Sequence, residues 1–387
     1  MPAKKLYYEN SYLTNFSTLV TGCTQDKDRF AITLADTAFY PEGGGQPYDL
    51  GYLLWDGNRI DILEVREKQG EVYHYSHSSV PVGAAIEGFI DFDRRFDLMQ
   101  QHTGEHILSG LVKSEYGFDN VGFHLTPKDM SVDFSGVLTQ NDLEKLMEKA
   151  NAIITENQPV TACYPENVEQ LDYRSKKELE GAIRIVTAGQ ADVCACCGTH
   201  TKTTGEVFCI FAFDSMNYKG GTRVFLACGG RAFKDYMAKN ATCYSISHLL
   251  SGKVEELVPA VQAKLDEAQA LRQEIAGLKN QLFALWTEQI PHGVLGFFEK
   301  EGLTPGELQR LAVLINAKCS VACCVSLQQE GSRKVCIVSS TLDTNTLGRS
   351  LCEQLQGKGG GKNGIFQCTV TADGNVQAAI EKAIAAS

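Results

Sequence analysis

A run of apolar residues at seven-residue spacing constrains the fold of this chain more than any other feature of its sequence. Two series coincide: Val254, Val261, Ala268, Ile275 and Leu282, and Leu257, Leu271, Leu278 and Leu285, with Lys264 as the one break. This pattern over four heptads predicts a long helix, either in a coiled coil or in a helical hairpin with a helix at 232–250. Pro259 falls near the first turn, where a helix tolerates proline. A homodimer through residues 254–285 and the intrachain hairpin both satisfy the pattern.

The long helix divides a chain of 387 residues, which exceeds the size of one ordinary domain. Residues 1–90 contain short, regularly spaced strand patterns and predict a small β-barrel with a glycine-rich loop. Residues 91–240 mix helices and strands, as in an α+β domain. The helical segment occupies 241–300, and residues 301–387 alternate helix-like and strand-like segments, as in a separate α/β domain. The predicted fold class is therefore α+β with several domains.

Short strand patterns and longer helical patterns fill the first 240 residues. The strand patterns are Ala31–Leu34, Tyr52–Trp55, Ile60–Leu63, Ala84–Ile90, Met130–Phe134, Ala182–Val186, Val207–Phe211 and Thr222–Leu226. Helical patterns run from Asp93 to about Ser114 and from about Leu138 to Asn157. Between the first strands lies the loop Tyr40–Pro47, whose three glycines permit backbone conformations closed to other residues.

Composition and charge narrow the class of protein. No apolar stretch has the length of a signal peptide or a membrane span, so we expect a cytoplasmic protein without a membrane partner. The fourteen cysteines lack the spacing of a disulfide framework, which favours free thiols. The formal charge of −11 argues against a general nucleic-acid coat. Residues 303–387 carry +2 and the remainder −13, so the C-terminal part is the expected contact for RNA.

Four residues in two motifs have the spacing and chemistry of a zinc site: His102, His106, Cys196 and His200. The first two histidines are four residues apart, so a helix places both imidazoles on one face. The cysteine and the third histidine belong to the glycine-containing turn C-C-G-T-H. Three imidazoles and one thiolate form a tetrahedral set that suits zinc better than magnesium or calcium. Cys194 and Cys197 are alternative thiolate ligands, but only Cys196 keeps the three-residue gap to His200.

The first of these motifs also fits a different function. With Glu105 between the two histidines, the segment matches the H-x-x-E-H pattern of zinc metallopeptidases, in which the glutamate is the general base. A peptidase of that kind requires a carboxylate as its third ligand. It also leaves the C-C-G-T-H turn and the glycine-rich loop unexplained.

Several pieces of the sequence, in this order, resemble the editing domain of alanyl-tRNA synthetase and its free-standing relatives, the AlaX-type editing proteins. They are Thr37-Ala-Phe-Tyr-Pro-Glu-Gly-Gly-Gly-Gln-Pro47, His102-x-x-x-His106, Cys196-Cys-Gly-Thr-His200 with Thr204-Gly-Glu206, and Gly221-Thr-Arg-Val-Phe225. This resemblance covers about residues 5–240. The heptad helix and the glycine-rich tail at 357–362 resemble the coiled coil and the C-terminal (DHHA1-like) domain that long AlaX proteins share with the synthetase.

The resemblance implies a fold, a cofactor and an activity. The implied fold is an N-terminal barrel, an editing domain shared with threonyl- and alanyl-tRNA synthetases, a helical segment and a C-terminal domain. The implied cofactor is one zinc ion on the four residues named above. The implied activity is trans-editing, the hydrolysis of Ser-tRNA(Ala) or Gly-tRNA(Ala), with the acceptor end of tRNA(Ala) as partner. No catalytic synthetase body precedes the glycine-rich loop, so we expect a free deacylase.

Further residues are candidates for contact with the substrate. The glycine loop is suited to bring backbone N–H groups to the terminal adenosine or the ester carbonyl. The substrate-binding candidates are Thr37, Gly43, Gly44, Gly45, Gln46, His124, Lys202 and Arg223. The family's serine-contacting side chain is often Thr or Gln, and the corresponding stretch here is Val121–Leu125. Candidates for contact with tRNA phosphates are the tail-loop residues Lys358, Gly359, Gly360, Gly361 and Lys362.

The role of zinc takes two forms in this hypothesis. Four protein ligands close a structural site, whereas catalysis requires an open position. Either His200 is a loose ligand and zinc acidifies a water, with Glu105 as the catalytic base, or zinc only orients the tRNA 3′ end. A non-catalytic tRNA-binding protein with structural zinc is a further alternative.

Overall fold

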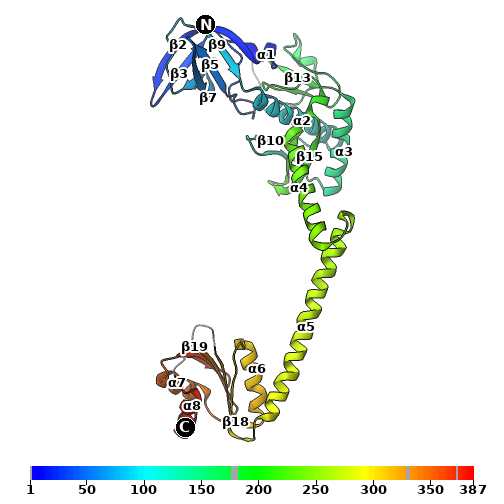
Figure 1. Cartoon of the computed structure of the whole chain (residues 1–387). Helices are drawn as coiled ribbons and strands as arrows, with labels where there is room; N and C mark the ends of the chain where they lie inside the picture. Colours follow the sequence, from blue (N-terminus) through cyan, green and yellow to red (C-terminus); the bar gives the residue numbers. More distant parts are fainter. Residues whose placement is uncertain (1, 176–181, 328–331, 372–373) are drawn as a thin grey trace. The chain divides into compact units, whose positions relative to one another are not determined.

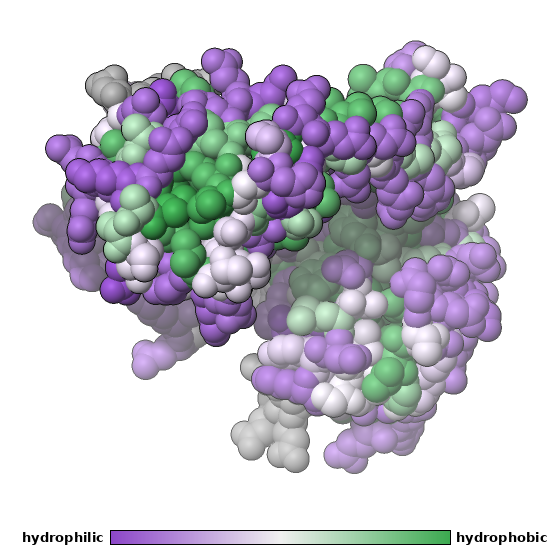
Figure 2. Space-filling model, turned by 90° about the horizontal axis from the view of Figure 1, so that it is seen from below, coloured by the Kyte–Doolittle hydropathy of each residue, from purple (hydrophilic) through white to green (hydrophobic). Residues whose placement is uncertain are grey.

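The computed structural model describes residues 2–175, 182–327, 332–371 and 374–387 (Figure 1). The chain forms two compact units, residues 1–246 and 247–387. Among the described residues, no helix combines the length and apolarity that a membrane span requires. All fourteen cysteines are free thiols. Hydrophilic residues cover most of the face shown in Figure 2, and hydrophobic residues gather in patches between them.

The first unit begins with a curled seven-stranded sheet in the order β6-β5-β9-β2-β3-β8-β7. Its strands are β2 (Asn15–Asp26), β3 (Arg29–Leu34), β5 (Gly51–Trp55), β6 (Asn58–Ile62), β7 (Glu64–Lys68), β8 (Glu71–Ser76) and β9 (Ala85–Ile90). A short parallel pair, β1 (Lys4–Lys5) with β4 (Asp36–Thr37), and the one-turn helix α1 (Leu6–Glu9) accompany the sheet. The long strand β2 pairs with β9 through its first half and with β3 through its second. A register shift between Val20 and Gly22 separates the halves and turns the strand.

A central helix, α2 (Phe92–Tyr116), follows the sheet. The Asp91 side chain caps its first turn by accepting from Arg94 N at 3.2 Å, and Gly117 ends it in the left-handed conformation. Every residue from Leu98 to Val112 is buried. The sequence pattern predicted one apolar face, whereas the helix is enclosed on all sides, so its polar residues must find partners inside the protein.

Two small sheets and a second helix enclose α2. One sheet has the order β10-β11-β16-β15 and the other β12-β13-β14. Their strands are β10 (Asn120–Leu125), β11 (Met130–Phe134), β12 (Val160–Cys163), β13 (Ile185–Ala188), β14 (Asp192–Ala195), β15 (Ile210–Tyr218) and β16 (Gly221–Cys228). The helix α3 (Gln140–Glu156) begins with a capping box between Thr139 and Asp142. Two short 3-10 helices, η1 (Val168–Gln170) and η2 (Thr204–Val207), complete this part. The strand predicted at Val207–Phe211 is wrong in its first residues, which lie in η2 and the turn after it.

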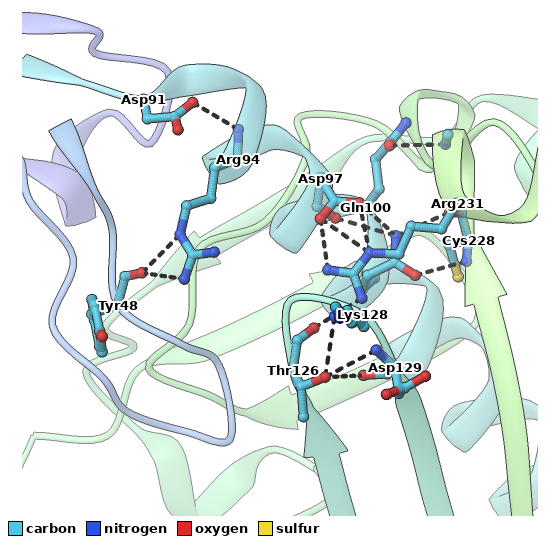
Figure 3. A network of polar contacts seen from close by, with 12 residues as sticks. Tyr48, Asp91, Arg94, Asp97, Gln100, Thr126, Lys128, Asp129, Cys228 and Arg231 are labelled. Carbon is cyan, nitrogen blue, oxygen red and sulfur yellow. Dashed lines mark hydrogen bonds and ion pairs between the residues drawn. The ribbon is translucent and has the colours of Figure 1, made fainter. Parts of the chain in front are cut away.

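A polar network fixes α2 to its neighbours (Figure 3). Arg231, at the start of α4 (Gly229–Leu250), contacts the Asp97 carboxylate on α2 at 2.7 Å and donates to Thr126 O at 2.9 Å. Arg94 donates to Tyr48 O from Nη2 at 3.1 Å. These contacts join the β10–β11 hairpin and the loop after the glycine triplet to the helix that carries two of the predicted zinc ligands.

The second unit contains η3 (Val254–Glu256), the long helix α5 (Leu257–Gln289) and a five-stranded sheet in the order β17-β18-β19-β21-β20. The strands are β17 (Gly293–Glu299), β18 (Cys319–Leu327), β19 (Ser332–Ser339), β20 (Lys358–Lys362) and β21 (Ile365–Thr371). Helix α6 (Pro305–Asn316) covers one face, and α7 (Thr344–Gln354) and α8 (Val376–Ala385) cover the other (Figure 1). Val321 and Cys323 of β18 face α7 and α8, while the alternate residue Ala322 faces α6.

Most heptad residues of α5 are exposed. They include Leu271, Ile275, Leu278, Leu282 and Leu285, with exposed fractions between 40% and 57%. Phe283, which lies outside the heptad series, is buried against α6. The predicted helix is confirmed, while the coiled coil, the hairpin and the homodimer stay predictions.

Candidate metal and substrate site

The four residues predicted as zinc ligands lie together in the first unit. Helix α2 stacks His102 and His106 on successive turns, with ring centroids 5.2 Å apart. The turn after β14 brings Cys196 and His200 to the same place. The Sγ of Cys196 lies 3.4 Å from Nε2 of His102 and 3.5 Å from Nε2 of His200. The ligand-type atoms of all four residues are within 4.8 Å of one another, and we call this group the metal cluster.

The dimensions of the metal cluster fit a zinc ion. Zinc–sulfur bonds of about 2.3 Å and zinc–nitrogen bonds of about 2.0–2.1 Å in a tetrahedron separate sulfur from nitrogen by about 3.5 Å. The two separations between Cys196 Sγ and imidazole nitrogens have this value. Three nitrogens and one sulfur are also a donor set that zinc prefers over hard cations.

Burial and neighbouring charges shift the pKa values of the metal cluster. Burial raises the pKa of the Cys196 thiol, but His102 and His106 outweigh burial and hold it well below its usual value. Burial lowers the pKa of His106, while the charge of Cys196 and the polar contact with Asp192 bring it well above its usual value. Burial and the nearby His102 lower the pKa of His200 to about 3. The lowered pKa of Cys196 favours the thiolate, the form that binds a metal.

Each imidazole has a separate partner for its other nitrogen. Nδ1 of His102 lies 2.9 Å from Oε1 of Gln46, and Nδ1 of His200 lies 3.2 Å from Oγ1 of Thr103. Nδ1 of His106 lies 2.8 Å from Oδ2 of Asp192, at ion-pair distance but without the alignment of a hydrogen bond. Partners of this kind fix the orientation of metal-binding imidazoles.

The C-C-G-T-H turn is held by close backbone packing. A Cβ at Gly198 would lie 2.2 Å from Cε1 of His102, so only glycine fits between the turn and the ring. Arg184 donates from Nη1 to the carbonyl oxygens of Cys196 at 3.0 Å and Gly198 at 2.9 Å. Gly198 N in turn lies 3.3 Å from Sγ of Cys196. These contacts place the thiolate toward the histidines.

A pocket of about 480 Å³ opens beside the metal cluster. Its lining includes His102, Phe123, Arg184 and the glycines Gly44 and Gly45. The Phe123 ring lies 5.2 Å from the His102 ring at an interplanar angle of 30°, and a Cβ at Gly45 would lie 2.7 Å from Phe123 Cδ1. An aromatic wall thus stands between the glycine loop and a residue of the metal cluster.

The glycine loop is a tight turn on which two of the predicted substrate contacts face the pocket. Gly43 and Gln46 exchange backbone hydrogen bonds of 3.1 and 2.9 Å, and Gly44 and Gly45 have φ of +60° and +83°. Gln46 is buried, and its amide binds His102 and Thr199. Of the predicted substrate-binding residues, Gly44 and Gly45 line the pocket, and Gln46 supports a residue of the metal cluster.

Four other predicted substrate contacts lie elsewhere. Thr37 is fully buried, with its Oγ1 2.8 Å from Nε2 of His74. Arg223 makes a two-point contact with Asp133, and His124 lies beside the same carboxylate with 58% of its side chain exposed. Lys202 is exposed, with Nζ 4.3 Å from the centre of the Tyr12 ring. None of the four lines the pocket as the described residues define it.

Glu105, the predicted catalytic base, is fully buried on α2. Its Oε1 accepts from Ser109 Oγ at 2.6 Å and from Asn120 Nδ2 at 2.5 Å. The residue is absent from the described lining of the pocket. In this position the carboxylate links α2 to the start of β10.

The tail candidates Lys358, Gly359, Gly360, Gly361 and Lys362 form the edge strand β20, although the sequence suggested a loop. All five residues are exposed. A Cβ at Gly359 would lie 2.2 Å from Gln367 O, so glycine permits the close approach to β21.

Arg184 and Asp192 are site residues that the sequence did not single out, and Phe123 was included only as part of the stretch Val121–Leu125. Phe123 precedes the predicted candidate His124, and strand alternation places neighbouring residues on opposite faces. Asp192 begins β14, four residues before Cys196. Its position as a polar residue close to the C-x-x-x-H motif was the one sequence feature that could have marked it as part of the site.

Comparison with known proteins finds matches along nearly the whole chain. Two family models match, one described as tRNA synthetases class II (A) at residues 6–94 and one described as the DHHA1 domain at residues 290–386. The alanyl-tRNA editing protein AlaX-L of Pyrococcus horikoshii is 26% identical over 95% of each chain. The alanyl-tRNA editing protein Aarsd1 of Mus musculus is 26% identical over 95% of this chain and 94% of its own. The alanine–tRNA ligase of Thermofilum pendens is 27% identical over 99% of this chain, which spans 44% of the ligase.

These matches define the class of protein first: the chain is similar to class II tRNA synthetases at residues 6–94 and to the DHHA1 domain at residues 290–386. Within that class, the chain is similar over nearly its whole length to alanyl-tRNA editing proteins of the long AlaX type. The resemblance that the motifs predicted is confirmed.

Proposed function

We propose that this chain is a zinc-dependent trans-editing hydrolase that deacylates mischarged tRNA(Ala), with Ser-tRNA(Ala) or Gly-tRNA(Ala) as substrate. The observation that carries the proposal is the metal cluster of three imidazoles and one thiolate beside a pocket of about 480 Å³. The two editing proteins described above, which match nearly the whole chain, support the same activity.

The residues around the pocket have defined tasks in this proposal. His102, His106, Cys196 and His200 would hold the zinc, with His200 as the loose ligand, and the bound ion would supply a Lewis acid for the ester and its attacking water. The backbone of Gly44 and Gly45 approaches the ester end of the tRNA, where N–H groups stabilise negative charge on the carbonyl oxygen. Phe123 limits the space for the amino acid and excludes water beside the metal cluster.

The peptidase alternative lacks support at two points. A peptidase of the H-x-x-E-H type uses a carboxylate ligand, whereas Cys196 and His200 occupy the remaining positions of the metal cluster. Its general base would be Glu105, which is buried against Ser109 and Asn120. The tRNA hydrolase accounts for both the metal cluster and the glycine loop.

The second unit supplies the remaining contacts with tRNA in this proposal. Lys358 and Lys362 stand at the two ends of an exposed edge strand, where phosphates can approach without steric obstruction. The exposed heptad residues of α5 would form the contact between the two chains of a dimer. Light scattering tests this, because a dimer has twice the mass of the 42.3 kDa chain.

The deciding experiment combines metal analysis with a three-substrate assay. Purified protein is analysed for zinc and then incubated with Ser-, Gly- and Ala-tRNA(Ala). We expect about one zinc per chain, and release of serine or glycine while alanine is spared. The proposal fails if all three substrates decay at the buffer rate with zinc present. Cleavage of casein by the same preparation would support the peptidase, and tRNA binding without deacylation would support the non-catalytic alternative.

A further inference from the structure

An arginine whose side chain is largely covered stands behind one histidine of the metal cluster. Arg174 contacts Asp192 at two points, from Nε to Oδ1 at 2.7 Å and from Nη2 to Oδ2 at 2.7 Å. Only 12% of the Arg174 side chain and 1% of the Asp192 side chain are exposed. The same Oδ2 of Asp192 lies 2.8 Å from Nδ1 of His106. The three side chains therefore form a continuous polar row that ends at the metal cluster.

The backbone of Arg174 is fixed to the strand that leads to Cys196. Arg174 N donates to Val193 O at 2.8 Å, and Ala195 N donates to Arg174 O at 2.9 Å. Arg174 is thus an added pairing position on β14, one residue before the turn that carries the thiolate. A displacement of Arg174 would therefore change the positions of both His106 and Cys196.

We propose that Arg174 and Asp192 are positioning residues that hold His106 in the orientation required for zinc. The inference rests on the proposed zinc site and adds two residues that the sequence motifs do not contain. Asp192 holds the Nδ1 side of the ring, so the Nε2 side is directed to the metal cluster. Arg174 fixes both carboxylate oxygens through its planar fork and keeps the carboxylate from rotating away.

The chain offers a matched control at a second arginine–aspartate pair. Arg223 contacts Asp133 in the same two-point manner, at 2.5 and 2.7 Å, and 7% of the Asp133 side chain is exposed. This pair belongs to the β11–β16 pairing and has no contact with the metal cluster residues in the described structure. Asp133→Asn and Arg223→Lys thus make the same chemical change away from the site.

Zinc affinity of the full chain, measured by competition with a chromophoric chelator, tests the proposal. We expect Asp192→Asn and Arg174→Lys each to weaken zinc binding by about tenfold to a hundredfold. We expect Asp133→Asn and Arg223→Lys to leave it within about threefold. Lysine keeps the charge but loses the fork, so loss in Arg174→Lys assigns the effect to geometry. Cobalt bound in place of zinc should show altered visible bands in the two site variants alone.

Three results separate the hypotheses. If both Asp192→Asn and Arg174→Lys bind zinc with wild-type affinity, the inference is overturned, but the proposed function as a zinc-dependent hydrolase is not affected. Equal losses in the control pair also overturn it, because general destabilisation then explains the effect. Absence of zinc binding by the wild-type chain overturns the proposed function itself. Where Asp192→Asn does not fold, the milder Arg174→Lys decides alone.

Discussion

Gln46 and His102, which are 56 residues apart in the chain, meet through a contact of 2.9 Å between Oε1 and Nδ1. Thr199 N donates to the same oxygen at 3.2 Å, while Gln46 Nε2 donates to Thr199 Oγ1 at 2.7 Å, so the amide orientation is determined. An amide oxygen can only accept, and Nδ1 of His102 must therefore carry the hydrogen. The lone pair is left on Nε2, which faces Cys196.

This contact predicts that Gln46 contributes to zinc binding, by orienting His102, and does not contact the substrate. Gln46→Leu should weaken zinc binding by about tenfold to a hundredfold, because the orientation of His102 is lost. Chelator competition gives the affinity. Gln101→Leu is the matched control, since Gln101 is also buried but binds the backbone of Cys228. Unchanged zinc affinity with a raised KM for mischarged tRNA would show that Gln46 contacts the substrate instead.

A second prediction concerns the aromatic wall of the pocket. Phe123→Ala removes the ring beside His102 and should admit larger amino acids. One methyl group in a pocket discriminates by about 10- to 200-fold, so we expect Thr-tRNA(Ala), whose amino acid carries one methyl group more than serine, to be hydrolysed at least about tenfold faster than by the wild type. Val121→Ala, at an exposed position of the same strand, serves as the control. Equal rates with Thr-tRNA(Ala) in both variants would exclude Phe123 from substrate selection.

The burial of Glu105 leads to a third prediction. Glu105→Gln preserves the shape of the side chain in its contacts with Ser109 and Asn120. We expect the deacylation rate to stay within about tenfold of the wild type, while thermal stability falls by a few degrees. Loss of a general base would instead reduce the rate by about 10² to 10⁴. A single-turnover assay with saturating enzyme measures the difference, and a loss of the larger size would restore Glu105 as the base.

The sequence predicted those parts of the site that depend on local spacing. His102 and His106 share a face of one helix, and Cys196 and His200 share one turn, so each pair is visible as a short motif. Local spacing could not predict that the two pairs lie close together in space, because about ninety residues separate them in the chain. The resemblance to a known family supplied that step.

Contacts across the fold account for what the sequence did not predict. Asp192 supports His106 from a strand far along the chain, and no spacing rule marks such a pair. The sequence could not tell whether Phe123 or His124 faces the pocket, because a shift of one residue in the register of β10 moves each side chain to the opposite face of the sheet. The glycine run of the tail has the composition of a loop. Pairing with β21, a tertiary contact, makes it the strand β20.

The last prediction concerns the buried His74 of the first sheet. Its Nδ1 donates to Ile32 O at 3.0 Å, and its Nε2 accepts from Thr37 Oγ1 at 2.8 Å. Burial lowers the pKa of His74 to about 4, against the opposing effect of the Ile32 hydrogen bond. An unfolded histidine titrates near 6.5, so between about pH 6.5 and pH 4 the unfolded chain binds a proton that the folded chain does not. This contribution to stability is complete above pH 6.5 and is lost as the pH falls toward 4.

The difference in unfolding free energy between wild type and His74→Gln should therefore shrink by roughly 3 kcal/mol between pH 7 and pH 4. Trp55 lies in the same sheet, so a Trp286→Phe background lets urea unfolding of the first unit be followed by its fluorescence. The measurement is made on zinc-free protein, which separates His74 from the histidines of the metal cluster. His77→Gln, at an exposed position nearby, is the control for replacing a histidine of the same sheet region by glutamine. Parallel pH curves for wild type and His74→Gln would contradict the assignment and place the acid sensitivity of this unit elsewhere.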